Sequence, residues 1–152
     1  MKSLLLIILL QSSTYYSDIS IVRTLYLSAY KNEVNCNRLG EKLNTIQENT
    51  SILIKGYKGC FYFIKCKFMN NPIDKLIYFN KGKKLLEDAI NQDPYSIELK
   101  FLRYSIQKNL PKFLLYYDNI EKDLNFVNGS IKYIKDKEVQ KFISTSLKSI
   151  TK

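Results

Sequence analysis

Apolar residues recur every three or four positions along most of the chain, and this spacing is the period of an α-helix. The pattern is clearest over residues 71–92, where apolar and small side chains share one face: Leu76, Phe79, Gly82, Leu86, Ala89 and Ile90. Asn71 can cap this helix, Pro72 suits its first position, and Asp74 adds negative charge to its first turn. We therefore expect a long amphipathic helix whose water-facing residues are Lys81, Lys84, Glu87 and Asp88.

The helix over 71–92 should end at Asp93-Pro94, because proline lacks the N–H that would continue it and disfavours helical geometry one residue earlier. Asp93 can then cap the next helix, with Pro94 at its first position. That helix should run to just before Leu110-Pro111 and bury Leu99, Phe101, Leu102 and Ile106. Because the break is so short, the two helices should be antiparallel neighbours.

Three helices are predicted before residue 71. The first begins at Asp18 or Ser20 and carries apolar residues on one side: Ile21, Val22, Leu25, Tyr26 and Ala29. The second covers about 32–46 and should bury Val34, Leu39 and Leu43. The third covers about 49–68 and is apolar on several sides, which is typical of a helix at the centre of a bundle.

Two helices are predicted after residue 110. One covers about 112–126 and is followed by a turn at Asn128-Gly129. The other is capped by Asp136 and carries Val139, Phe142, Ile143, Leu147 and Ile150. The predicted fold is therefore all-α: antiparallel helix hairpins stacked as a short bundle or solenoid of about six to seven helices, with no strand.

The N-terminus has the pattern of a secretory signal peptide. Lys2 precedes an unbroken apolar run from Leu4 to Leu10, and small polar residues follow. The run is far shorter than the roughly 20 residues that span a bilayer, so we expect no transmembrane anchor. We expect residues 1–13 to be removed on export to the periplasm or outside the cell, leaving a single helical domain over 14–152; a cytoplasmic protein with an apolar first helix is the alternative.

The composition changes the functional picture in two ways. The chain has a formal charge of +10, which suggests an anionic partner such as nucleic acid or a membrane surface. Only three basic residues are arginines, however, and the lysines are spread along the chain, as in a protein with a general lysine, asparagine and isoleucine bias. There is no histidine, which excludes histidine bases, His-assisted nucleophiles and His metal ligands.

Three cysteines allow either free thiols or one disulfide. Cys60 and Cys66 are six residues apart on one predicted helix, so they point to different faces and cannot pair. Cys36 can meet either of them across a helix hairpin, although buried free thiols are the first expectation. Without histidine or a C-x-x-C pair, we expect no metal site and no cofactor.

The segment 49–107 resembles a degenerate tetratricopeptide repeat. A helix hairpin has small residues, Gly82 and Ala89, on its second helix, and Pro94 lies at the closing turn. The resemblance implies a concave peptide-binding face, but no ligand-binding residue of the family can be carried over. The whole chain also looks like short exported bacterial proteins with this helical layout, and that likeness implies no activity.

Several local patterns have both a functional and a structural interpretation. The motif from Gly56 to Gly59 is a G-x-x-G like the nucleic-acid clamp of KH domains, but without flanking strands glycine-mediated helix packing is favoured. The acidic run 118–123 is expected to be a solvated face rather than a catalytic pair. Tyr116 and Tyr117 are the candidate partner surface, because tyrosine is enriched at binding hot spots.

We therefore predict a non-catalytic protein- or peptide-interaction module that buries a partner segment in a groove rimmed by lysine and tyrosine. The alternative is a cytosolic basic helical protein that binds nucleic acid.

Overall fold

The computed structural model describes residues 2–47 and 51–150, with side chains from residue 16 onward. Within these residues the chain forms seven α-helices, three short 3₁₀ turns and no strand, so the predicted all-α bundle is confirmed. The α-helices are α1 (Lys2–Ala29), α2 (Glu33–Thr45), α3 (Ile52–Lys65), α4 (Pro72–Gln92), α5 (Ile97–Asn109), α6 (Ile120–Ser130) and α7 (Lys137–Ile150). The 3₁₀ turns are η1 (Cys66–Phe68), η2 (Lys112–Leu114) and η3 (Ile131–Tyr133).

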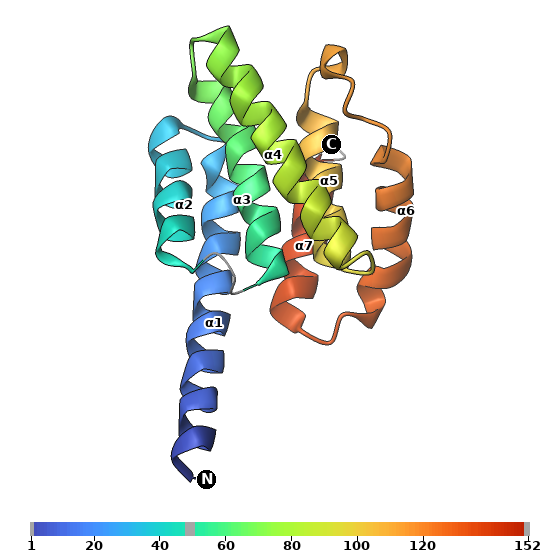
Figure 1. The fold of residues 1–152 in the computed structure, drawn as a ribbon. Helices are drawn as coiled ribbons and strands as arrows, with labels where there is room; N and C mark the ends of the chain where they lie inside the picture. The colour runs from blue at the N-terminus through green and yellow to red at the C-terminus, as the bar shows by residue number, and fades with distance from the viewer. Residues whose placement is uncertain (1, 48–50, 151–152) are drawn as a thin grey trace.

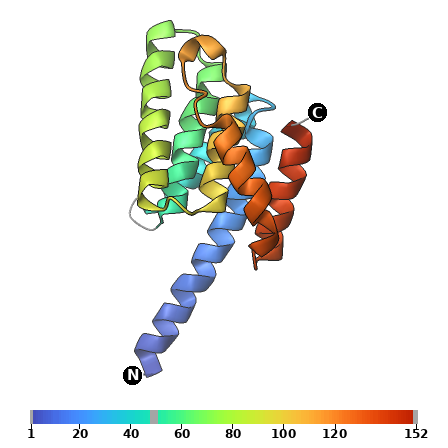
Figure 2. The same cartoon turned by 90° about the vertical axis from the view of Figure 1, so that its right-hand side faces the viewer.

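Two helices, α3 and α5, form the centre of the bundle (Figures 1 and 2). Helix α3 packs against α1, α2, α4 and α5, while α5 packs against α3, α4, α6 and α7. The central position of α3 follows from its sequence, because an apolar residue on nearly every side needs a neighbour on every side. The largest fully buried side chains include Tyr57 on α3 and Phe101 and Tyr104 on α5.

Glycines allow α3 and α4 to cross closely. A Cβ atom added at Gly59 would lie 2.9 Å from the backbone oxygen of Gly82 and 2.8 Å from the backbone nitrogen of Leu86. A Cβ atom added at Gly56 would lie 2.3 Å from Cδ2 of Leu99 and 3.8 Å from Cβ of Ala89. The small residues singled out in the sequence therefore lie where the hairpin helices approach each other.

Helix α5 is buried on all sides from Glu98 to Gln107, which the sequence analysis did not foresee. The predicted stripe of apolar residues is buried, but Lys100, Arg103 and Ser105 are buried too. These polar residues are accommodated because neighbouring helices supply partners for them.

Helix α1 is a single uninterrupted helix, so the prediction that a helix starts at Asp18 or Ser20 is wrong. Its N-terminal part extends away from the bundle as an isolated arm, at the end opposite to η1 and η2 (Figures 1 and 2). The described residues that hold α1 against the bundle include the buried Ile19 and Asp18, which forms an ion pair of 2.6 Å with Lys42. Ile21, expected to be buried, is exposed because it lies on the far side of the helix.

The junction between α4 and α5 differs from the prediction in its capping residue. Helix α4 begins as expected, with Asn71 as its cap and Pro72 in the first turn. Asp93 is the C-cap of α4, however, and Ser96 is the N-cap of α5, where its hydroxyl accepts a hydrogen bond from the Leu99 N–H. The N-cap of α5 thus lies three residues later than predicted, which places Pro94 in the turn rather than in α5.

The chain between α5 and α7 is the least well predicted part. Instead of one helix over 112–126, η2 is followed by Leu115 in the left-handed conformation, with φ of 49°, and α6 starts only at Ile120. Asn128-Gly129 is helical rather than a turn. The predicted capping of α7 is confirmed, because the Asp136 carboxylate accepts hydrogen bonds from the N–H groups of Glu138 and Val139.

Smaller corrections concern α2, α3 and the thiols. Val34 is exposed, since it lies opposite the α2 face that buries Leu39 and Leu43. The predicted start of the third helix near Asn49 lies outside the described residues, and α3 is capped by Ser51. All three cysteines are free in the structure, which contains no disulfide from Cys36 to Cys60 or Cys66.

Candidate functional site: an apolar pocket between α3, α4 and η2

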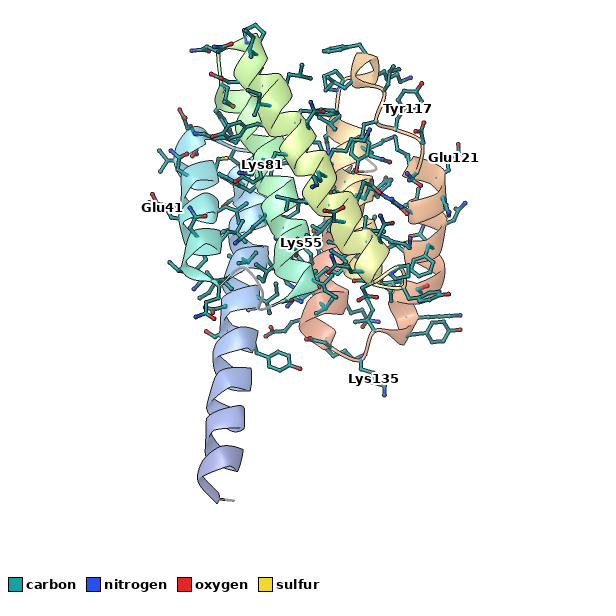
Figure 3. The ribbon with its side chains drawn as sticks, in the orientation of Figure 1. Glu41, Lys55, Lys81, Tyr117, Glu121 and Lys135 are labelled. Carbon is teal, nitrogen blue, oxygen red and sulfur yellow. The ribbon has the colours of Figure 1, made fainter. Side chains whose placement is uncertain are left out.

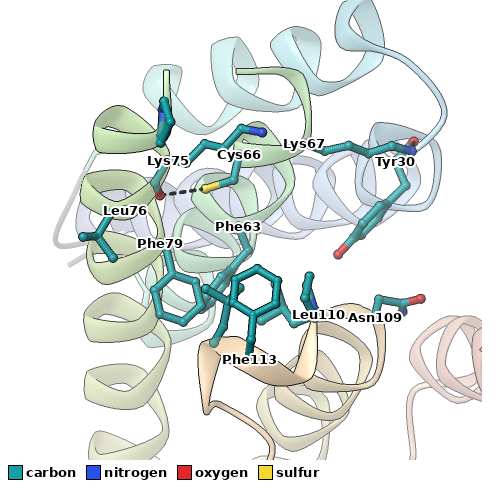
Figure 4. Close-up of a pocket in the computed structure, with 13 residues that line it drawn as sticks. Tyr30, Phe63, Cys66, Lys67, Lys75, Leu76, Phe79, Asn109, Leu110 and Phe113 are labelled. Atoms are coloured by element: carbon teal, nitrogen blue, oxygen red, sulfur yellow. Dashed lines mark hydrogen bonds between the residues drawn. The ribbon is translucent and has the colours of Figure 1, made fainter. Parts of the chain in front are cut away.

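A pocket of about 530 Å³ opens at the end of the bundle that carries η1 and η2 (Figure 4). Its residues come from four separate segments, namely the end of α1, the end of α3 with η1, the first turns of α4, and the end of α5 with η2. They are Tyr30, Phe63, Cys66, Lys67, Pro72, Lys75, Leu76, Phe79, Asn109, Leu110, Pro111, Phe113 and Leu114. The volume is within the range of roughly 300–1,000 Å³ that is usual for ligand-binding pockets.

The ends of α3 and α5 determine where the pocket opens. Helix α3 ends in η1, and the loop to the Asn71 cap separates the end of α3 from the start of α4. At the other side, Pro111 follows the C-cap residue Leu110, which is extended, so the chain turns outward into η2 instead of continuing α5. The pocket lies between these two interruptions of helical structure.

A cluster of three aromatic rings forms the inner side of the pocket. The Phe63 and Phe79 rings meet edge to face at a centroid distance of 5.4 Å, and Tyr116 stacks on Phe63 at 5.6 Å. Such ring pairs are stabilising and rigid. Tyr116 itself is 5 % exposed, and its hydroxyl donates a hydrogen bond to Glu87, so it supports the pocket from behind. The prediction that Tyr116 belongs to an exposed partner surface is therefore wrong.

The mouth of the pocket carries exposed apolar side chains. Phe113 on η2 is 79 % exposed, and Leu76 on α4 is 56 % exposed, so Leu76 is not the core residue that its spacing indicated. Ile73 and Ile77 are exposed beside Leu76 on the same helix at spacings of three or four residues, which brings them together on one face of α4. Apolar residues gathered around a pocket in this way are typical of a binding site.

The polar part of the rim is basic. Lys67 donates a hydrogen bond of 2.8 Å to the backbone oxygen of Tyr30, and its ammonium lies near the rings of Tyr30 and Phe68. Lys75 is exposed on the first turn of α4. Among the described residues that line the pocket there is no aspartate or glutamate. Neither lysine forms an ion pair within the described part of the chain, so the charge of the rim is not balanced there.

Cys66 lies in the pocket wall (Figure 4). Its thiol donates to the backbone oxygens of Tyr62 and Lys75, at 3.2 and 3.3 Å, and burial raises its pKa above the ordinary value. Cys66 is half-buried, whereas Cys36 and Cys60 have no exposed surface. It is therefore the thiol of this chain that a reagent in the pocket reaches first.

The remaining predicted surface residue, Tyr117, is 45 % exposed. Figure 3 shows it on the segment between η2 and α6, near Glu121 at the start of α6. It follows the buried Tyr116 directly but does not line the pocket. Of the predicted pair, Tyr116 is thus buried behind the pocket and Tyr117 lies on the neighbouring surface.

The acidic run after Tyr117 is not a solvated face throughout. Asp123 has no exposed surface and accepts two hydrogen bonds from the guanidinium of Arg103, at 2.6 and 2.9 Å. Arg103 also donates to Glu87, and Lys100 lies 3.9 Å from Asp123. Burial lowers the pKa of Lys100, and the charge of Asp123 acts in the opposite direction. This network joins α4, α5 and α6.

A second buried network joins α1, α3 and α5. Arg23 donates two hydrogen bonds of 2.8 Å to the Glu98 carboxylate, and the Tyr57 hydroxyl donates a third at 2.6 Å. Burial works against the charge of Arg23, but the hydrogen bonds and charge of Glu98 raise its pKa. Two of the three arginines, Arg23 and Arg103, are thus held inside the fold, where they cannot contact phosphate groups. The G-x-x-G motif lies within the packed helix α3 and not in a loop.

The pocket was not predicted from the sequence. The sequence pattern predicts a groove rimmed by lysine and tyrosine, but it places Phe79 and Leu76 in the core and indicates a helix over 112–126. The available signal was Pro111, which interrupts an apolar stretch and exposes Phe113.

No helix among the described residues has both the length and the apolar character needed to cross a membrane. No group of three or more histidine, cysteine, aspartate or glutamate side chains suited to a metal ion occurs in the same part of the chain. No protein family, no curated protein and no solved structure matches the chain.

Proposed function

We propose that this chain is a non-catalytic interaction module that binds an apolar segment of a partner protein in the pocket between α3, α4 and η2. The observation that carries the proposal is the combination of an apolar pocket of about 530 Å³ with exposed apolar side chains at its mouth. Fully burying one leucine or phenylalanine contributes about 1.5–3 kcal/mol. Covering Leu76 and Phe113 with a partner therefore supplies a substantial part of a micromolar affinity, which corresponds to about −8 kcal/mol.

The pocket is also preformed. Its inner side is a rigid set of packed rings, and its walls belong to helices fixed by buried networks, so a partner segment meets a surface that needs little rearrangement. The tetratricopeptide-like interpretation of residues 49–107 agrees with peptide binding, and it remains a prediction.

We further propose that the protein acts outside the cytoplasm after removal of residues 1–13. The observation in support is that the N-terminal part of α1 extends away from the bundle (Figures 1 and 2). The test is the intact mass of the protein from separated cell fractions. An exported chain lacking about thirteen residues supports the proposal, and a full-length chain confined to the cytosol contradicts it.

Binding at the pocket can be tested with peptides selected against the wild-type protein. The variant L76S/F113S removes two exposed apolar side chains at the mouth, and L27S/Y133S removes a similar pair from the surface elsewhere. We expect L76S/F113S to weaken binding of the selected peptides by about 10- to 100-fold, since two contacts are lost. The control pair should bind as wild type does.

The readouts are fluorescence anisotropy of the labelled peptide and the rate of alkylation of Cys66. A bound peptide should slow alkylation, because Cys66 lies in the pocket wall. Circular dichroism melts of both variants show whether the fold is kept. Peptides that bind wild type and L76S/F113S equally well, with no protection of Cys66, would rule out the pocket as the binding site.

A further inference from the structure

We infer that the partner segment is acidic, with carboxylate side chains flanking the apolar residues that enter the pocket. This inference rests on the proposed function and adds the chemical class of the partner. It comes from the charge of the rim, which the apolar lining alone does not determine.

The two charged side chains that line the pocket are both lysines, Lys67 and Lys75. They lie on different elements, Lys67 in η1 and Lys75 in the first turns of α4, and both border the apolar lining (Figure 4). Some lysines elsewhere on the molecule are paired with acids: Lys42 with Asp18, Lys65 with Glu33 and Lys55 with Asp88. The rim is therefore a place where positive charge is left for a partner to balance.

The lysine side chains can also contact both the apolar residues and the carboxylates of such a partner. The ammonium of Lys67 lies 5.6 Å from the centre of the Phe68 ring and bonds to the end of α1, which holds the long side chain against the pocket. Its stem adds apolar surface while its charge remains at the edge. A carboxylate arriving at this edge meets a cation whose position is already restricted, so it loses less entropy on pairing.

A free fatty acid has the same chemistry of an apolar chain and a carboxylate. We favour a peptide because the exposed apolar residues extend beyond the pocket along α4, to Ile73 and Ile77, over a surface that a single acyl chain in the pocket leaves uncovered. A peptide that fills the pocket can cover this surface as well.

The test compares three short synthetic peptides that share the same leucine and phenylalanine residues and differ only in the flanking residues, which are glutamate, glutamine or lysine. Binding to the full chain is measured by fluorescence anisotropy and by protection of Cys66 from alkylation, with C66S as the control for labelling of the other thiols. We expect the glutamate peptide to bind about tenfold more tightly than the glutamine peptide, and more weakly as salt is added. The lysine peptide should bind least.

Charge-reversal variants locate the effect. K67E/K75E should remove the preference for the glutamate peptide, while K135E/K141E, with the same change in net charge, should keep it. Lys135 and Lys141 are exposed and do not line the pocket, and Figure 3 shows Lys135 at the opposite end of the bundle. The glutamine peptide reports whether the pocket of each variant is intact.

The outcomes separate the two proposals. Equal binding of the glutamate and glutamine peptides, with Cys66 protected by both, would overturn the acidic partner and keep the apolar binding site. A loss of preference in K135E/K141E as large as in K67E/K75E would show that only the overall charge matters, which also overturns the inference. If oleate protects Cys66 and displaces every peptide, the occupant is a lipid rather than a protein. If no peptide binds, the proposed function fails as well.

Discussion

At the scale of single residues, the contact between Gly59 and Gly82 determines how closely the two helices of the α3–α4 hairpin approach. The neighbours of a Cβ atom at Gly59 are backbone atoms of α4, at 2.8 and 2.9 Å. Backbone atoms cannot rotate away as the end of a side chain can. A methyl group at this position therefore forces the two helices apart.

We expect G59A to lower the free energy of unfolding by about 1–3 kcal/mol, in spite of the higher helix propensity of alanine. Gly129 provides a matched control, since it is also in a helix but has no atom within 4 Å of the added Cβ position. G129A should raise the free energy of unfolding by about 0.5–1 kcal/mol. Urea denaturation of both variants gives the comparison, and a G59A protein at least as stable as wild type would show that α3 and α4 are not in close contact.

The close approach of α3 and α4 was predictable from the glycines in the sequence. The burial of Arg103 and Asp123 was not predictable from residue identity. Glycines at helical spacing in two adjacent helices have few explanations other than close packing. A charged residue in a helix is usually solvated, so Arg103 and Asp123 gave no sign in the sequence that they meet. Their pairing depends on the placement of α6 against α5, which is a long-range property of the fold.

At the scale of elements, that buried pair joins α6 to α5, beside the fully buried apolar side chain of Val127. Asp123 is the one member of the network on α6, and it faces Arg103 and Lys100 on α5 within the described residues. Two cations buried without Asp123 would carry a large desolvation cost. The Asp123 carboxylate is thus a polar link that helps to hold α6 against α5.

We expect D123N to lower the free energy of unfolding by about 3 kcal/mol, because the amide keeps the shape of the side chain but not its charge. The exposed Asp118 lies five residues earlier, and D118N should change the stability by less than about 0.5 kcal/mol. Chemical denaturation followed by far-UV circular dichroism measures both. A D123N variant within about 1 kcal/mol of wild type would show that solvent reaches the network.

Element boundaries were predictable where a capping residue had no competitor. Asn71-Pro72 and Asp136 start α4 and α7 as expected, because each is a lone capping residue before an amphipathic stretch. At the α4–α5 junction both Asp93 and Ser96 are residue types that suit an N-cap, and no local signal favours the second. In the segment after Pro111, helical spacing of apolar residues led to the prediction of a helix that the left-handed Leu115 interrupts.

At the scale of the whole molecule, the pocket is a product of tertiary arrangement. Its lining residues lie between positions 30 and 114, and each segment alone is consistent with an ordinary core or loop. The sequence therefore allowed the fold class and most helices to be predicted, and it allowed the chemical character of a groove to be anticipated. The position of that groove depended on how α1, α3, α4 and η2 end at the same side of the bundle.

Buried cysteine and tyrosine side chains, which lose a proton at alkaline pH, should lower the stability of the fold as the pH rises. Burial raises the pKa of Cys36 from 9.0 to about 11, and it raises the pKa values of Tyr26 and Tyr57 well above 10.0. Between the unfolded and folded pKa values the native state holds more protons than the unfolded state, so the free energy of unfolding falls as pH rises. The lowered pKa of Lys100 makes the free energy of unfolding rise with pH, but this is one group, whereas several buried thiols and tyrosines have the opposite effect.

The stability contributed by these groups should be complete below about pH 9 and lost progressively above it, first through the three thiols, since burial raises the pKa values of Cys60 and Cys66 as well as that of Cys36, and then, above about pH 10, through the tyrosines. Urea midpoints measured under reducing conditions from neutral pH to above pH 10 test this. C36A should show a smaller decline between about pH 9 and pH 11, because Cys60 and Cys66 still contribute to it. A midpoint that stays constant across the range would mean that these side chains are accessible to solvent in the folded protein.

The two polar contacts of α1 with α5 have a consequence for the order in which the chain can fold during synthesis. Arg23 can form its contact only after Glu98, 75 residues later, has been synthesised, and Tyr26 only after Ser105, 79 residues later. Until α5 has left the ribosome, the first helix has a cation and a hydroxyl without their native partners, and α3 lacks one of the helices that cover it. Most of the chain therefore remains incompletely folded until residues as late as Ser105 have been synthesised and have left the ribosome.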